Sequence, residues 1–118
     1  MLLYGAGPSR STRAAWALEE VGADWEYYKL NLRIGEARRD PYLTINPGGK
    51  VPALVDGEFV LTESLAVVTY IGEKFPESGL VPTDPQQRAL YFQWSSFAIS
   101  ELEQPLWSIA KHKFALPK

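Results

Sequence analysis

Two adjacent polar residues, Glu63 and Ser64, stand where an apolar helical segment is expected to begin. A helix N-terminus presents unpaired backbone N–H groups and a partial positive charge, so it binds a carboxylate readily. The Ser64 hydroxyl adds a donor, and the Glu63 carboxylate can accept from an ammonium group. The pair therefore suits a ligand that carries both charges. The alternative is plain helix capping, with Thr62 as the N-cap and Glu63 stabilised by the helix dipole.

A second pair of hydroxyls, Ser9 and Ser11, lies at the expected start of an earlier helix. Either hydroxyl can cap that helix or donate a hydrogen bond to a ligand. The sequence has no cysteine, which excludes disulfides, thiolate metal sites and a protein thiol as nucleophile. His112 is the only histidine, so no histidine dyad can form, and we interpret it as a surface residue.

The elements expected to position these residues alternate between strand and helix. They are a strand at 1–4, a helix from 9 or 11 to 23 that Gly22 can end, a strand at 25–32, at most a short helix within 33–47, strands at 51–55 and 58–61, and a helix at 62–75. Asp56-Gly57 predicts a tight hairpin turn with positive φ at both residues. Leu65, Val68 and Ile71 lie along one side of the last helix. This order predicts an α/β fold, in which a βαβ unit, an antiparallel hairpin and a covering helix form a small mixed sheet.

The rest of the chain is interpreted as a second, helical part. Proline and glycine mark residues 76–84 as a linker between domains at 1–75 and 85–118. Asp84-Pro85 favours the start of a helix, and Pro105 must kink or divide it. Apolar residues between Leu90 and Ile109 form a stripe that needs a covering surface, which is the first domain, further chain or a second copy.

Composition limits the partners of the protein. Its 118 residues include 12 basic and 14 acidic ones, for a net charge of −2, so neither nucleic acid nor an anionic membrane is expected as a partner. The first residues show no basic leader and no long apolar run. We therefore expect a soluble, cytoplasmic protein.

Three motifs, in this order, resemble those of the glutathione transferase family. They are Gly7-Pro8-Ser9-Arg10-Ser11-Thr12-Arg13 with Trp16-Ala17-Leu18-Glu19-Glu20, then Asn46-Pro47-Gly48-Gly49-Lys50-Val51-Pro52-Ala53-Leu54, then Leu61-Thr62-Glu63-Ser64-Leu65-Ala66. The first motif is similar to that of serine-type, bacterial and theta-like members. The resemblance implies a thioredoxin-like βαβ-α-ββ-α domain, followed by the start of an all-α domain. It implies glutathione as co-substrate and no metal.

The resemblance also implies a role for the residues of the second and third motifs. The γ-glutamyl head group of glutathione would lie at Glu63 and Ser64. The peptide bond between Val51 and Pro52 would be cis, although local sequence alone predicts trans. The Val51 backbone would then pair with the cysteinyl part of glutathione as a short added strand. Lys50 would approach the glycine carboxylate, or else remain a solvated surface residue.

In the same comparison the nucleophile is the sulfur of glutathione. Ser9 would donate a hydrogen bond to that sulfur, because Ser9 and Arg13 have the spacing of the theta-like pattern, and Ser11 is the alternate. Lowering the thiol pKa by about two units requires roughly 2.7 kcal/mol, within reach of a charge-assisted hydrogen bond and a helix dipole. Arg10 is a candidate for polarising the sulfur or is simply solvated. Tyr4 is a weaker candidate and is interpreted as a packed strand aromatic.

Family members are longer, and their C-terminal helices form most of the pocket for the electrophile. We therefore expect weak or no transfer to a small electrophilic substrate by these 118 residues alone, although they should bind glutathione. The resemblance also implies a homodimer, because family interfaces use the helix that Glu63 begins and the first C-terminal helix. Two alternatives stay open. One is a glutathione-dependent disulfide reductase or peroxidase in which two glutathiones exchange, and the other is a non-catalytic interaction module of the same fold.

Overall fold

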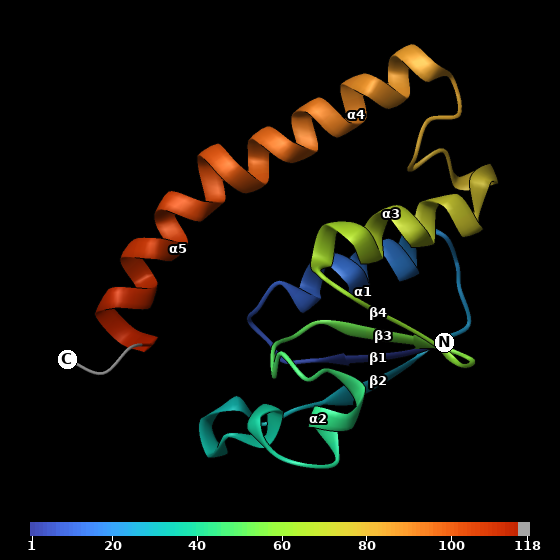
Figure 1. Ribbon diagram of the computed structural model, residues 1–118. Helices are drawn as coiled ribbons and strands as arrows, with labels where there is room; N and C mark the ends of the chain where they lie inside the picture. Colours follow the sequence, from blue (N-terminus) through green and yellow to red (C-terminus); the bar gives the residue numbers. More distant parts are fainter. Residues whose placement is uncertain (116–118) are drawn as a thin grey trace. The chain divides into compact units, whose positions relative to one another are not determined.

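The computed structural model describes residues 1–115, which fall into two compact units. The first unit is Met1–Leu80 and the second begins at Val81. The division lies within the segment 76–84 that the sequence analysis interprets as a linker. Each unit is described by itself below (Figure 1).

The first unit is a four-stranded mixed sheet in the order β2-β1-β3-β4. Its strands are β1 (Leu2–Gly5), β2 (Glu26–Lys29), β3 (Ala53–Asp56) and β4 (Phe59–Thr62). β1 and β2 are parallel, whereas β1 with β3 and β3 with β4 are antiparallel. Helices α1 (Ser11–Glu20) and α3 (Ser64–Lys74) cover one face of the sheet, and α2 (Tyr42–Ile45) lies on the other (Figure 1). The expected α/β fold is confirmed.

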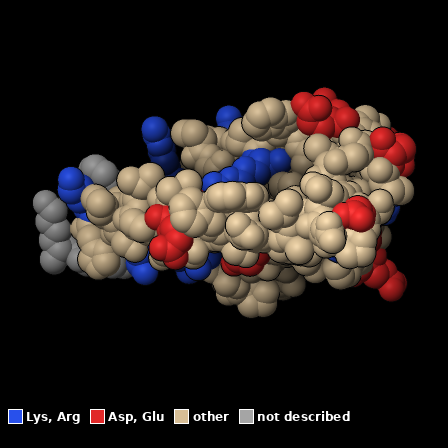
Figure 2. Space-filling view, turned by 90° about the horizontal axis from the view of Figure 1, so that it is seen from above, with Lys and Arg blue, Asp and Glu red and all other residues tan. Residues whose placement is uncertain are grey.

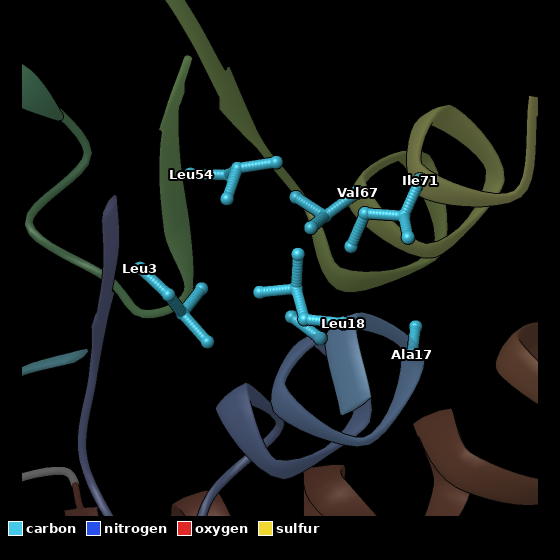
Figure 3. Packing of buried hydrophobic residues seen from close by; sticks show 7 residues of the cluster. Leu3, Ala17, Leu18, Leu54, Val67 and Ile71 are labelled. Atoms are coloured by element: carbon cyan, nitrogen blue, oxygen red, sulfur yellow. The ribbon is translucent and has the colours of Figure 1, made fainter. Parts of the chain in front are cut away.

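Alternating side chains of the strands build a core on each face of this sheet. On the side of α1 and α3, Leu3 and Leu54 point toward Leu18, Val67 and Ile71, which are all buried (Figure 3). The next residues along each strand face the other way, toward α2. The cluster there consists of Leu30, Ala37, Tyr42 and Ala53, with Tyr4 packed against it. The Tyr4 ring lies 5.1 Å from that of Tyr28 and 5.7 Å from that of Tyr42, as expected for a packed strand aromatic.

The ends of α1 show how short polar residues and glycine limit a helix. Its N-cap is Arg10, whose side chain makes no capping hydrogen bond, and the Ser9 hydroxyl accepts from the Ser11 N–H at 3.1 Å instead. At the other end Gly22 has a φ of 62°, and the Ala23 N–H returns to the Leu18 carbonyl at 3.0 Å. Gly22 therefore terminates the helix, as predicted.

The hairpin between β3 and β4 is present, but its turn lies one residue later than expected. Asp56 pairs with Phe59, so Gly57 and Glu58 form the two-residue loop. Only Gly57 has a positive φ, of 62°, which fits a turn with glycine at its first central position. The Asp56 side chain instead accepts hydrogen bonds from Tyr70 and Lys74 of α3.

Helix α3 differs from expectation at its start and in its buried face. Thr62 is the last residue of β4, and the helix begins two residues later, at Ser64. Ile71 is buried as expected, whereas Leu65 and Val68 are only half-buried. The buried positions are Ser64, Val67, Ile71 and Gly72. The helical period indicates one side of the helix, but it does not determine which residues of that side pack most closely against the sheet.

The second unit is a long helical run with a change of pitch. It consists of α4 (Pro85–Phe97), a π-helical stretch (Ala98–Glu103), α5 (Gln104–Ala110) and a π-helical turn (Lys111–Ala115). Asp84 caps α4 by accepting from the Gln86 and Gln87 N–H groups at 3.0 Å each. The π-helical stretch ends just before Pro105, which lacks a backbone donor. The hydrogen-bond pattern changes beside Pro105, but the chain stays helical on both sides, so the predicted kink or division stays a prediction.

The surface carries charged groups and many exposed apolar side chains. On the face in Figure 2 most of the surface is uncharged, and basic and acidic side chains lie in small separate groups. Exposed large hydrophobic residues are common along the second unit: Leu90, Phe92, Trp94, Phe97, Leu102, Leu106, Trp107 and Ile109. Among residues 1–115, no helix is both long and apolar enough to cross a membrane.

Candidate functional site

A pocket of about 230 Å³ lies in the first unit, at the start of α3. Its lining residues are Arg10, Asn46, Gly48, Lys50, Val51, Pro52, Thr62, Glu63 and Ser64. The set includes every residue that the sequence analysis assigns to glutathione binding, from the second and third motifs alike. We call it the α3 pocket. Two segments separated along the chain therefore meet there through the pairing of β3 with β4.

The N-terminus of α3 has the properties of an anion site. Glu63 is the N-cap, with a φ of 68°, and its side chain is exposed and makes no capping hydrogen bond. Its carbonyl accepts from the Val67 N–H at 3.0 Å, the first bond of the helix. The N–H groups of Ser64 and the next two residues precede that bond and have no partner within the helix. Capping by Thr62 is wrong, because Thr62 belongs to β4.

Ser64 is buried at the head of this helix, with 4% of its surface exposed. Its hydroxyl oxygen accepts a hydrogen bond from Arg13 Nη1 at 3.2 Å. A hydroxyl has one proton and two acceptor positions, so this contact leaves the proton of Ser64 to donate. Arg13 of α1 thus reaches the site, although the sequence analysis used it only to count back to Ser9.

The loop before Val51 is fixed by side chains of α2 and its C-cap. Asn46 is buried, and its Nδ2 donates to the Lys50 carbonyl at 2.8 Å while its Oδ1 accepts from the Gly48 N–H at 3.0 Å. The Tyr42 hydroxyl donates to the same Lys50 carbonyl. Burial raises the pKa of Tyr42, so the hydroxyl keeps its proton at neutral pH. Neither residue was predicted as part of the site, and Asn46 lines the pocket.

The same loop approaches its neighbours too closely for most side chains. Gly49 has a φ of 57°, and a Cβ there would lie 2.7 Å from the Ala37 carbonyl oxygen. Glycine is therefore required at this position. The Val51–Pro52 peptide bond that follows is cis, as the family resemblance implied. Lys50 lines the pocket with an exposed side chain.

The two candidate serines at the start of α1 have different surroundings. Ser11 is buried, with 1% exposed, and its hydroxyl accepts from the Ala6 N–H at 3.3 Å. Ser9 is half-buried, and its hydroxyl donates to the Ala6 carbonyl and lies 2.9 Å from the Ser11 hydroxyl. Neither serine lines the α3 pocket, but Arg10 between them does. Ser9 is thus the more accessible hydroxyl, and it must release the Ala6 carbonyl before it can donate to a ligand.

His112 is exposed, as the sequence analysis expected, and lies in the second unit. Its Nδ1 is 2.7 Å from the Ser108 carbonyl. In the part of the chain that the structure describes, no group of three histidine, cysteine or acidic residues is arranged to hold a metal ion.

Comparison with known proteins agrees with this geometry. Residues 1–73 match the family model described as "Glutathione S-transferase, N-terminal domain". The chain belongs to the glutathione S-transferase family. Among curated relatives, the "Glutathione S-transferase zeta class" of Euphorbia esula is 42% identical over 106 residues, which are 90% of this chain and 47% of the relative. "Glutathione S-transferase 1" of Dianthus caryophyllus is 43% identical over 98 residues, 83% of this chain and 44% of the relative.

Solved structures of glutathione transferases share the fold. A Sulfitobacter homologue with bound glutathione superposes with a TM-score of 0.78 at 33% identity, over 84% of this chain and 48% of that one. The theta class enzyme of Xanthomonas axonopodis pv. citri, also with glutathione bound, gives 0.77 at 33% identity, over 85% and 48%. The chain spans about half the length of the relatives it matches. Zeta and theta class relatives both match, so the theta-like, serine-type assignment stays a prediction.

Proposed function

We propose that the α3 pocket binds glutathione and that the protein presents it for transfer to an electrophile. The observation that carries the proposal is the meeting of Glu63 and Ser64, at a helix N-terminus, with Val51 and Pro52 in one pocket. Glutathione-bound structures of the Sulfitobacter and Xanthomonas relatives support this choice of ligand. In the proposal residues 1–75 form the binding domain.

Each part of glutathione has a matching group in the pocket. The γ-glutamyl carboxylate accepts hydrogen bonds from the first N–H groups of α3 and from the Ser64 hydroxyl. The Ser64 oxygen accepts from Arg13, so its proton is directed to the ligand. The γ-glutamyl ammonium donates to the exposed Glu63 carboxylate. The cysteinyl backbone pairs with Val51, and Lys50 approaches the glycine carboxylate.

Transfer requires that the glutathione sulfur be ionised and face the electrophile. The thiol of glutathione has a pKa near 8.5 in water, so only a few per cent is thiolate at neutral pH. The Ser9 hydroxyl, released from the Ala6 carbonyl, donates to the sulfur and favours the thiolate, and the thiol proton passes to water. The thiolate then forms a carbon–sulfur bond with the electrophile as its leaving group departs with the bonding electrons.

Calorimetric titration of glutathione against matched variants tests the proposal. Glu63→Gln removes the charge that faces the ammonium, and we expect about tenfold to a hundredfold weaker binding, since a hydrogen bond to a charged group contributes about 1.5–3 kcal/mol. Glu58→Gln makes the same change in the exposed hairpin turn, outside the pocket, and should leave affinity unchanged. Equal affinity of the wild type and both variants would exclude Glu63 as a ligand.

The proposal extends to the setting of the protein, which we infer from the family: a cytoplasmic homodimer that uses a small electrophile. Sedimentation at micromolar concentration tests the dimer, and a monomer there would contradict it. Conjugation of an aryl halide, assayed beside reduction of a mixed disulfide, distinguishes transfer from glutathione-dependent disulfide exchange. Because these 118 residues match only about half the length of the relatives, we expect weak or no conjugation by them alone.

A further inference from the structure

The carbonyl oxygen of Lys50 accepts two side-chain hydrogen bonds beside the α3 pocket. One comes from the Tyr42 hydroxyl and the other from Asn46 Nδ2, at 2.8 Å. Both donor residues are almost fully enclosed, with exposed fractions of 2% for Tyr42 and 7% for Asn46. Buried donors cannot exchange this partner for water at low cost, so the two bonds hold the carbonyl in one direction.

That direction also determines where the next backbone N–H points. The Lys50–Val51 bond is trans, since each cis bond of the described chain precedes a proline. In a planar trans peptide the C=O and N–H groups point in opposite directions. Holding the Lys50 carbonyl therefore aims the Val51 N–H. Val51 lines the pocket and precedes Ala53, the first residue of β3 in the sheet register, so the sheet does not fix this N–H.

We propose that Tyr42 and Asn46 are positioning residues, which aim the Val51 N–H at the cysteinyl carbonyl of glutathione. The inference rests on the proposed function, in which the Val51 backbone pairs with that part of the ligand. A chain that binds an extended peptide through one or two backbone bonds gains affinity only if those groups are already oriented. The buried clamp on Lys50 supplies this orientation from outside the pocket.

Two substitutions remove one clamp bond each with little change of shape. Tyr42→Phe deletes the hydroxyl and keeps the buried ring. Asn46→Asp keeps an oxygen that can accept from the Gly48 N–H and replaces the donor to Lys50 by an acceptor. The control is Thr44→Val, because Thr44 lies on the same helix and its hydroxyl donates to the Pro41 carbonyl at 2.6 Å, away from Lys50.

The first measurement compares two ligands on the full 118-residue chain. Glutathione carries the cysteinyl carbonyl, whereas γ-glutamylethylamide keeps the zwitterionic head group and lacks that carbonyl. We expect Tyr42→Phe to lower the affinity for glutathione roughly threefold to tenfold, and Asn46→Asp to lower it somewhat more. This is the size of effect expected when one hydrogen bond is lost or misdirected. Affinity for γ-glutamylethylamide should change less than about twofold. Equal weakening of both ligands would mean a general structural role and would overturn the proposal.

The second measurement needs no ligand. We expect the ¹⁵N order parameter of the Val51 amide to fall in Tyr42→Phe and Asn46→Asp and to stay at the wild-type value in Thr44→Val. An unchanged order parameter in both clamp variants would overturn the clamp even if glutathione binds. If the wild type does not bind glutathione although the Val51 order parameter falls in the two clamp variants, the clamp stands and the proposed function, with its assigned ligand, is refuted.

Discussion

The two units of the chain bury their apolar residues to very different degrees. The first unit has a cluster of buried apolar side chains on each sheet face, and Leu3, Leu18, Val67 and Ile71 are completely buried. In the second unit none of the described residues of α4 or α5 is buried. Their apolar residues include Trp94 and Leu106, at 60% and 69% exposed.

The difference in burial suggests that apolar residues serve the folded core in the first unit and contact another surface in the second. The sequence of the first unit specifies a closed core and, at the edge of that core, a pocket. The second unit exposes many large apolar side chains, and we expect another surface to cover them, because soluble domains rarely expose large apolar patches. The predictions below test that division, beginning with the largest effect.

Truncating one leucine in each unit should change the free energy of unfolding by very different amounts. Leu18→Ala leaves a cavity in the core between α1 and the sheet, and we expect a loss of about 2–5 kcal/mol in the free energy of unfolding. Leu106→Ala removes a side chain that is exposed in the single chain, and it should change the free energy of unfolding of the monomer by less than about 0.5 kcal/mol. Urea unfolding measures both. Similar losses at the two positions would show that the second unit is packed as firmly as the first.

Within the first unit, the two serines should separate activation from structure. We expect Ser9→Ala to raise the thiol pKa of bound glutathione by about 1–2 units, the equivalent of one hydrogen bond to a charged group. Ser11→Ala should instead cost about 1–2 kcal/mol of stability, because the Ala6 N–H loses its buried acceptor. Ultraviolet absorbance of the bound thiolate against pH gives the first quantity, and thermal unfolding gives the second. A larger pKa change in Ser11→Ala would reverse the assignment.

The smallest effect concerns the contact between the hairpin and α3. Hydrogen bonds from Lys74 and then Tyr70 lower the pKa of Asp56 below its usual 3.8. The ionised carboxylate therefore stabilises the fold above about pH 3.8, and this contribution is lost as the pH falls through the lower folded-state value. Asp56→Asn should lower the Tm slightly at pH 7 and reduce the further loss on acidification. The effect should shrink in high salt, because Lys74 is 40% exposed.

If Asp56→Asn gives the same acid titration of Tm as the wild type, other carboxylates dominate the acid response. A loss at pH 7 as large as that of Leu18→Ala would show that the hairpin contact, rather than the core, limits stability.

Local signals in the sequence predicted much of the fold. Gly22 ends α1 and Asp84 caps α4 because these effects depend on a few neighbouring residues. The turn after Asp56 was misplaced by one residue, and α3 begins at Ser64 rather than at Thr62. Both depend on the register in which β3 and β4 pair, which neighbouring residues do not determine.

The pocket was predicted by family motifs rather than by local physics. Sequence alone favours a trans bond before Pro52, and only the resemblance implied the cis bond that the structure has. Tyr42, Asn46 and Arg13 were missed. Tyr42 and Asn46 act on a backbone carbonyl, and Arg13 acts on a serine 51 positions away. Such contacts exist only after the sheet brings its segments together. An asparagine before Pro47-Gly48 was the one available signal, since asparagine commonly bonds the backbone in turns.

The central claim is that glutathione binds at the N-terminus of α3, in the first unit. A ¹H–¹⁵N NMR titration of the full chain tests it most directly, because each backbone amide reports separately. We predict that the largest saturable shifts occur at Val51, Ser64 and Leu65, with little change from 85 to 113. Shifts confined to the second unit, or none at millimolar glutathione, would contradict the account.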